Sequence, residues 1–139
     1  MIEIKDETEK VILVGVALSD QDDTKESLEE LKDLVSTAGA ETAGMLIQNR
    51  EQQHPATYVG KGKIEELKNM IWELRATGIV CDDELSPAQM KNLQDELDVK
   101  VMDRTLIILD IFAARASTSE GKIQVELAQL KFHCSLKLH

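Results

Sequence analysis

Aromatic residues are scarce in this sequence, whose 139 residues include two phenylalanines, one tryptophan and one tyrosine. The hydrophobic core must therefore be built from aliphatic side chains. Stacking of bases on aromatic side chains cannot be the main mode of any nucleic-acid binding, because that mode needs several such platforms.

Cysteines and long apolar runs are sparse as well. Cys81 and Cys134 stand far apart, without a CxxC pattern or a histidine cluster, which favours two free thiols in a reducing compartment. No apolar run approaches the roughly 20 residues that span a membrane. The charged start "MIEIKDETEK" does not resemble a signal peptide, so we expect a cytoplasmic protein with no membrane partner.

Charge is plentiful but uneven along the chain. The formal net charge is −10, and residues 1–60 hold 13 acidic against 5 basic residues, whereas residues 61–139 hold 13 against 11. The acidic first part would repel a polyanion. If a nucleic acid is a partner, we expect it to contact the second part.

Strand and helix signals alternate along residues 1–115. The run "KVILVGVAL" is typical of a strand buried on both faces of a parallel sheet. Short connections between the segments predict a mostly parallel sheet of four to five strands with flanking helices, an α/β domain. The predicted strands span residues 10–18, 42–49, 78–83 and 99–103.

The predicted helices carry distinct start signals. Asp23 with Glu26, and Ser86 with Gln89, each match the spacing of a capping box. The helix between them should run from about Lys63, after the glycines of "VGKGK", to residue 76. A fourth, mostly apolar helix follows residue 103 and ends near residue 115.

Residues 116–139 differ from the part before them. A further capping box precedes an apolar stripe with spacings of four, three and four residues, which is typical of a helix that pairs with another helix. We therefore expect the first helix of a longer helical hairpin, and an exposed seam that could produce an artefactual dimer. The stripe consists of Ile123, Leu127, Leu130 and Cys134.

Residues 57–67, "TYVGKGKIEEL", resemble a phosphate-binding loop at first sight. A nucleotide-hydrolysing loop needs G-x-x-x-x-G-K followed by serine or threonine, and none of the Gly-Lys pairs in the sequence meets this requirement. Gly60 and Gly62 can still present amides to an anion beside Lys61 and Lys63. The pattern alone favours the plainer interpretation, a tight turn with solvated lysines.

Two acidic residues follow the predicted third strand. Asp82 and Asp83 would lie at the carboxyl edge of the sheet, where ligands of open α/β sheets bind and where two carboxylates can hold magnesium. They also complement the dipole of the next helix, and no base or third ligand accompanies them. We therefore expect no metal site and no catalytic residue in this chain.

A basic ridge is possible on the fourth and last helices. Its members would be Arg104, Arg115, Lys122 and Lys131. The alternative is that the arginines pair with nearby carboxylates, namely Asp103, Asp110 or Glu120.

Three blocks of sequence carry a resemblance to a known family. They are "PATYVGKGKIEELK", "DDELSPAQMKNLQDEL" and "VKVMDRTLIILDIFAARASTSEGKIQVELAQLK", in this order. The chain resembles the N-terminal domain of the HflX family of ribosome-associated GTPases. Two departures from the family pattern are Leu106, where many relatives have glycine, and the ending "FHCSLKLH".

The resemblance implies an α/β subdomain over residues 1–115, a hairpin beginning in residues 116–139, and a GTPase domain that this chain lacks. GTP and Mg²⁺ would belong to the full-length protein, with no cofactor in this chain. The implied role is docking on the large ribosomal subunit and its RNA to support ribosome splitting or rescue, together with regulation of the protein's own GTPase domain.

The same resemblance makes Gly60, Lys61, Gly62, Lys63 and Arg104 candidates for contact with RNA or with another domain. Two alternatives stay open. One is an ATP-binding domain that uses Lys61 and Lys63 for phosphates and the two aspartates after the third strand for magnesium. The other is a purely intramolecular regulator of GTP hydrolysis.

Overall fold

A computed structural model describes residues 8–18 and 23–116 of the chain. Its four strands are all parallel and lie in the order β2-β1-β3-β4. The strands are β1 (Lys10–Ala17), β2 (Glu41–Asn49), β3 (Gly78–Cys81) and β4 (Lys100–Asp103). The predicted α/β class with a mostly parallel sheet is therefore confirmed, with four strands.

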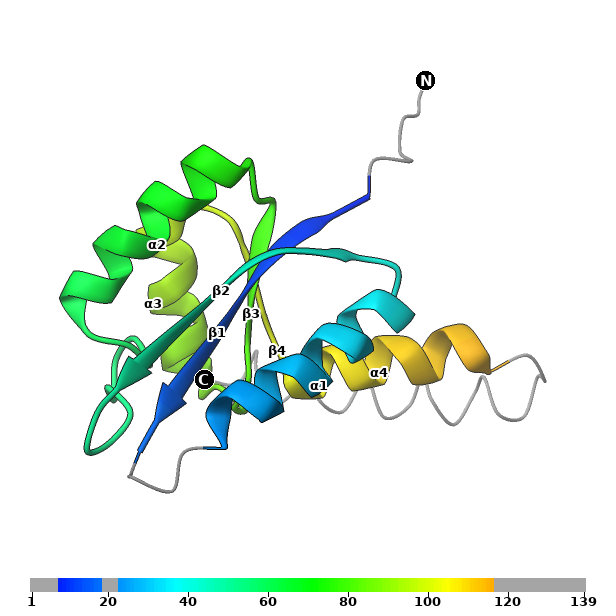
Figure 1. The fold of residues 1–139 in the computed structure, drawn as a ribbon, viewed down its shortest axis with the longest axis horizontal. Coiled ribbons are helices and arrows are strands. Elements are labelled where there is room, and N and C mark those ends of the chain that lie inside the picture. The colour runs from blue at the N-terminus through cyan, green and yellow to red at the C-terminus, as the bar shows by residue number, and fades with distance from the viewer. Residues whose placement is uncertain (1–7, 19–22, 117–139) are drawn as a thin grey trace.

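Four helices connect or follow these strands within the described residues. They are α1 (Thr24–Thr37), α2 (Lys61–Leu74), α3 (Pro87–Leu97) and α4 (Arg104–Arg115). Helices α1 and α4 cover one face of the sheet, and α2 and α3 cover the other (Figure 1). None of the described helices is long and apolar enough to cross a membrane.

The central strand β1 is buried on both faces, as its continuous apolar run predicts. Ile12 and Val14 pack in the cluster beneath α2 and α3, whereas Val11 and Leu13 pack in the cluster beneath α1 and α4. All four side chains have no exposed surface. Because side chains alternate across a strand, a strand sandwiched between helices needs apolar residues at every position.

Two predictions about helix starts were wrong. Asp23 lies at the N-cap of α1 but its side chain makes no capping hydrogen bond, so the predicted box is absent. Helix α2 begins at Lys61 rather than Lys63 and ends at Leu74, because Gly62 takes a helical conformation instead of a turn. The glycine most important for the turn is therefore Gly60, the N-cap.

Other local predictions agree with the structure. Ser86 and Gln89 form the expected capping box on α3, with Pro87 at the first helical position. Helix α4 ends at Arg115, where the sequence predicted the end of the fourth helix. The apolar stripe that predicted a hairpin helix, from Ile123 onward, lies outside the described residues.

Candidate functional site

The carboxyl ends of all four strands meet at one edge of the sheet, where the arrowheads of β1 and β2 point in Figure 1. Strand β2 lies on one side of β1 and β3 on the other, so this edge contains the topological switch point of the sheet. Ligands of open α/β sheets bind preferentially at such a point. A cavity of about 230 Å³ lies here, lined by Val16, Leu18, Asp23, Thr24, Ser27, Asp82 and Asp83.

Arg104 crosses this edge and is held by three partners. Its Nη2 donates to Asp82 Oδ1 (2.8 Å) and to the Ser27 carbonyl (2.9 Å), and its Nη1 donates to Glu30 Oε1 (2.6 Å). Burial alone would lower the pKa of Arg104, but the hydrogen bonds to Asp82 and Glu30 outweigh it and raise the pKa. The guanidinium therefore stays charged and ties α4 to α1 and β3.

Arg104 does pair with carboxylates, as the alternative to a basic ridge expected, but its partners differ from Asp103 and Asp110, and Glu120 lies outside the described residues. In the described residues its carboxylate partners are Asp82 and Glu30. Both true partners are distant in sequence and are brought close only by the parallel sheet. The Arg104 side chain is 22% exposed, so most of its surface is already used inside the domain.

Asp83 is engaged as well. The hydroxyl of Tyr58 donates to Asp83 Oδ2 at 2.6 Å. Burial, and next the hydrogen bond to Asp83, raise the pKa of Tyr58 far above its usual value. Tyr58 has no exposed surface and a φ of 69°, so the loop before α2 is locked onto the end of β3.

Asp82 and Asp83 thus both hold protein groups at this edge. No group of three histidine, cysteine or carboxylate side chains suited to a metal ion occurs among residues 8–18 and 23–116. The carboxylates complete a network that runs from Tyr58 across the ends of the strands to Arg104 and α1. Both aspartates therefore have a structural role in the fold, as acceptors for Tyr58 and Arg104.

The glycine-lysine segment lies beyond the end of β2. The Gly60 amide donates to Gln48 Oε1 at 2.7 Å, so one of the donors that could hold an anion is already used. Lys61 opens α2 as an exposed residue, and Lys63 pairs with Glu66 at 3.1 Å on the surface. This geometry fits a tight strand-to-helix turn in which Lys61 has no ion-pair partner within residues 8–18 and 23–116.

The structure does not gather the candidate residues into one site. Lys61 and Lys63 follow β2, Asp82 follows β3, and β1 lies between these two strands. Arg104 and Arg115 stand at opposite ends of α4, about 17 Å apart along a helix of 12 residues. The other two members of the predicted basic ridge, Lys122 and Lys131, lie outside the described residues.

Comparison with known proteins identifies the family. The model of the family described as GTP-binding GTPase N-terminal matches residues 25–113, more than half of the chain. The chain belongs to the HflX family of GTPases. It is 66% identical to the GTPase HflX of Lacrimispora saccharolytica over 95% of this chain and 31% of that protein, and 42% identical to the GTPase HflX of Escherichia coli over 99% and 32%.

This HflX N-terminal domain therefore spans about three-tenths of the length of the curated relatives it matches. A solved structure with the same architecture is that of SsGBP in complex with GDP, with a TM-score of 0.72 and 26% identity over 93% of this chain and 36% of that chain. A second is a GTP-binding protein from Sulfolobus solfataricus, also with GDP, with a TM-score of 0.68, 26% identity and coverages of 94% and 38%. The sequence contains no phosphate loop, and this agrees with its match to a model of an N-terminal domain.

The HflX N-terminal domain also contains a hydrogen-bonded loop, residues 54–57, that the sequence analysis did not predict. His54 Nδ1 accepts from the amides of Ala56 (3.1 Å) and Thr57 (3.3 Å), and the His54 carbonyl accepts from Gln89 Nε2 (2.9 Å). The Ala56 carbonyl accepts from Asn92 Nδ2 (3.0 Å), so the loop is tied to α3. The histidine, isolated in the sequence, is a turn residue that positions the glycine-lysine segment.

Proposed function

We propose that this HflX N-terminal domain is a noncatalytic docking module that binds the large ribosomal subunit through its RNA and supports ribosome splitting or rescue in the cytoplasm. The observation that carries the proposal is the distribution of charge. Arg104, Asp82 and Asp83 satisfy one another or neighbouring groups at the sheet edge, which leaves no catalytic arrangement among the described residues there. Lys61 is exposed at the start of α2 and forms no ion pair with any residue that the structure describes.

Sedimentation with purified large subunits across a salt series tests this proposal. Each neutralised phosphate contributes a slope of about −0.7 to −0.9 to log K against log salt concentration. Three contacts would weaken binding about 20- to 40-fold between roughly 50 and 200 mM salt. Binding that does not change with salt would contradict the electrostatic part of the proposal.

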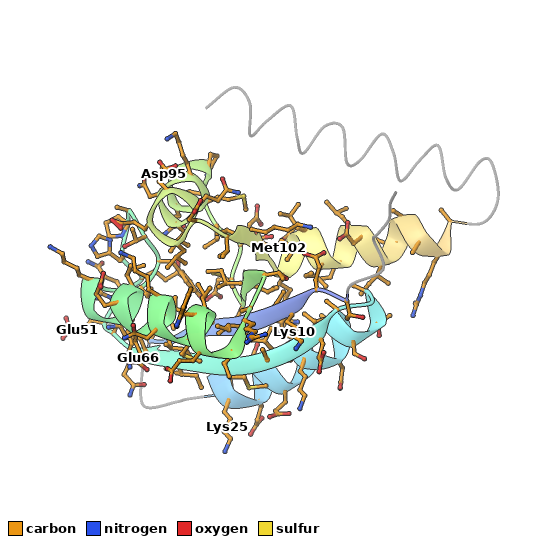
Figure 2. All side chains as sticks on the ribbon, turned by 90° about the horizontal axis from the view of Figure 1, so that it is seen from above. Lys10, Lys25, Glu51, Glu66, Asp95 and Met102 are labelled. Carbon is orange, nitrogen blue, oxygen red and sulfur yellow. The ribbon has the colours of Figure 1, made fainter. Side chains whose placement is uncertain are left out.

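A matched pair of double variants locates the contact. Lys61→Ala/Lys63→Ala removes two positive charges from the start of α2, and Lys25→Ala/Lys32→Ala removes two exposed charges from α1, on the other face of the sheet. Figure 2 shows Lys25 projecting outward from α1, so its loss should not disturb the fold. We expect the first variant to bind more weakly and with a smaller salt slope, and the second to bind as the wild type does.

The domain is also proposed to contact the GTPase domain of the full-length protein and to modulate GTP hydrolysis. This part is tested by comparing ribosome-free GTP turnover of full-length protein with that of protein lacking residues 1–115. Equal turnover would restrict the role of the domain to docking.

The ATP-binding alternative receives less support from the contacts. The Gly60 amide and both aspartates already have partners, so a phosphate and a magnesium ion would each have to displace an internal hydrogen bond. Calorimetry with ATP and Mg²⁺ should therefore give no heat of binding. Heat that disappears in Lys61→Ala/Lys63→Ala would favour ATP binding instead.

A further inference from the structure

Helix α4 is apolar on two opposite sides. Ile107 and Ile111 are buried against the sheet, in the core cluster that α4 shares with α1. Leu109 lies two residues from each of them, about 200° around the helix, so it belongs to the side that points away from the sheet. This outer side follows steps of four, three and four residues, through Thr105, Leu109, Phe112 and Ala116, and none of the four carries a charge.

The outer side of α4 is only partly covered by the elements that the structure describes. Phe112 is 53% exposed and belongs to neither of the two core clusters. Helix α1 lies beside α4, whereas α2 and α3 lie across the sheet (Figure 1). A helix that is apolar all round is normally buried, so the outer side of α4 needs a further neighbour.

A groove continues this outer side at the start of α4. It has a volume of about 410 Å³ and lies between α3, the last strand β4 and α4, with the apolar lining residues Pro87, Met90, Val101, Met102 and Leu106. Two lysines also line it, and both pair with carboxylates, Lys91 with Asp95 and Lys100 with Glu9. An apolar partner therefore fits this surface better than a polyanion does.

The chain supplies a matching segment directly after α4. Ala116 leaves the helical conformation, with a ψ of 86°, so α4 does not simply continue. Residues 117–139 open with the predicted capping box, and so short a connection places the next helix antiparallel beside the previous one. The apolar stripe from Ile123 to Cys134 has the same steps of four, three and four residues as the outer side of α4. Each of the two spans covers 12 residues, a length of about 17 Å in a helix.

We propose that residues 117–139 pack antiparallel along the outer side of α4, with Ile123 beside its last turn and Cys134 at the groove. Attachment favours this occupant over a second copy of the chain, because a short connection gives the segment an effective concentration of about millimolar. The hairpin is then anchored at the β4 edge of the sheet, opposite to β2 and the glycine-lysine segment. This packing does not depend on any contact with the ribosome.

Cross-linking of the 139-residue chain tests this packing. Gln94→Cys places a thiol at the groove, on an exposed position of α3, and a short bismaleimide should join it to Cys134 within one chain. Asn69→Cys is the matched control, because Asn69 is exposed on α2, which packs over β2 at the other edge of the sheet. It should give no link to Cys134. Cys81 is buried and does not compete for the reagent.

The reactivity of Cys134 with iodoacetamide, followed by mass spectrometry, gives a second readout. Cys134 should react at least about tenfold more slowly in the wild type than in Leu127→Asp, because the added charge cannot dock on an apolar surface. Phe112→Ala should raise the rate as well, whereas Trp72→Ala, which removes an aromatic side chain that is 84% exposed on α2, should leave it unchanged.

Three results would overturn the proposal. The first is a Gln94→Cys chain that forms no link to Cys134. The second is a link that joins only two separate chains, at twice the mass, which would assign the outer side of α4 to a second copy. The third is an equal rate of Cys134 alkylation in the wild type, Phe112→Ala and Leu127→Asp.

Discussion

Replacing Asp103 by alanine should destabilise the domain by about 2–4 kcal/mol. Asp103 has no exposed surface and ends β4 as the N-cap of α4. Its Oδ1 accepts from the Leu106 amide at 3.0 Å, and its Oδ2 accepts from the buried Leu85 amide at 2.9 Å. One side chain therefore caps a helix and satisfies the loop after β3.

The magnitude follows from these two hydrogen bonds. Loss of a helix cap costs about 1 kcal/mol, and leaving a buried amide without an acceptor costs about 1–3 kcal/mol. The sum is a large part of the roughly 5–15 kcal/mol that stabilises a typical domain. Asp103→Asn should lose about half as much, because the amide has one oxygen and its nitrogen would face a donor.

Urea unfolding followed by circular dichroism measures the effect, with the slope m expected to stay constant. Asp110→Asn makes the same chemical change at an exposed position of α4 and should shift stability by no more than about 0.5 kcal/mol. The reasoning is refuted if the free energy of unfolding of Asp103→Ala lies within about 0.5 kcal/mol of the wild-type value. It is also refuted if Asp103→Asn is as stable as the wild type.

Two further predictions follow from buried contacts and from backbone space. The pKa of Tyr58, the only tyrosine, is raised, so phenolate absorbance should stay absent well above pH 10 while the domain is folded. The stability that this shift contributes is complete below the pKa of the unfolded state. It is lost as pH rises through the pKa of the folded state. An ordinary titration near pH 10 would contradict the contact with Asp83. Gly62→Ala should stabilise by about 0.5–1 kcal/mol, since its Cβ would meet no atom within 4 Å inside α2. Gly78→Ala should destabilise by about 1–3 kcal/mol, since its Cβ would lie 2.7 Å from the Lys100 carbonyl; similar melting temperatures for the two variants would refute both.

The features that the sequence predicted well are those written into a few neighbouring residues. The run from Val11 to Val16 predicts a doubly buried strand because each face of the sheet takes every second residue. Ser86, Pro87 and Gln89 predict a helix start because the box needs residues three positions apart. These local rules were sufficient for the succession of strands and helices along the chain and for the α/β class, but not for the exact helix ends.

The features that the sequence did not predict depend on residues far apart in the chain. Arg104 is 22 positions from Asp82 and 74 from Glu30, and nearer carboxylates looked equally good before the sheet was known. The contact of Tyr58 with Asp83 spans 25 positions. Trp72 fits the sequence as an ordinary helix residue, because the pattern of α2 alone does not say which flank of the helix stays uncovered.

The contacts distinguish residues that stabilise the fold, such as Asp103 and Arg104, from surface residues that remain available to a partner, such as Lys61. Asp103 and Arg104, in the "DRT" block that resembles the family, each have an internal structural task, so their presence in a family motif is explained without a ligand. Recruiting Arg104 to a phosphate would leave Asp82 without its partner beneath α1, which is costly for a largely buried carboxylate. Lys61 can meet a polyanion without breaking any ion pair of the described residues. A docking face at the start of α2 therefore requires less rearrangement than one on the carboxyl edge of the sheet, and substitutions there should change binding before they change stability.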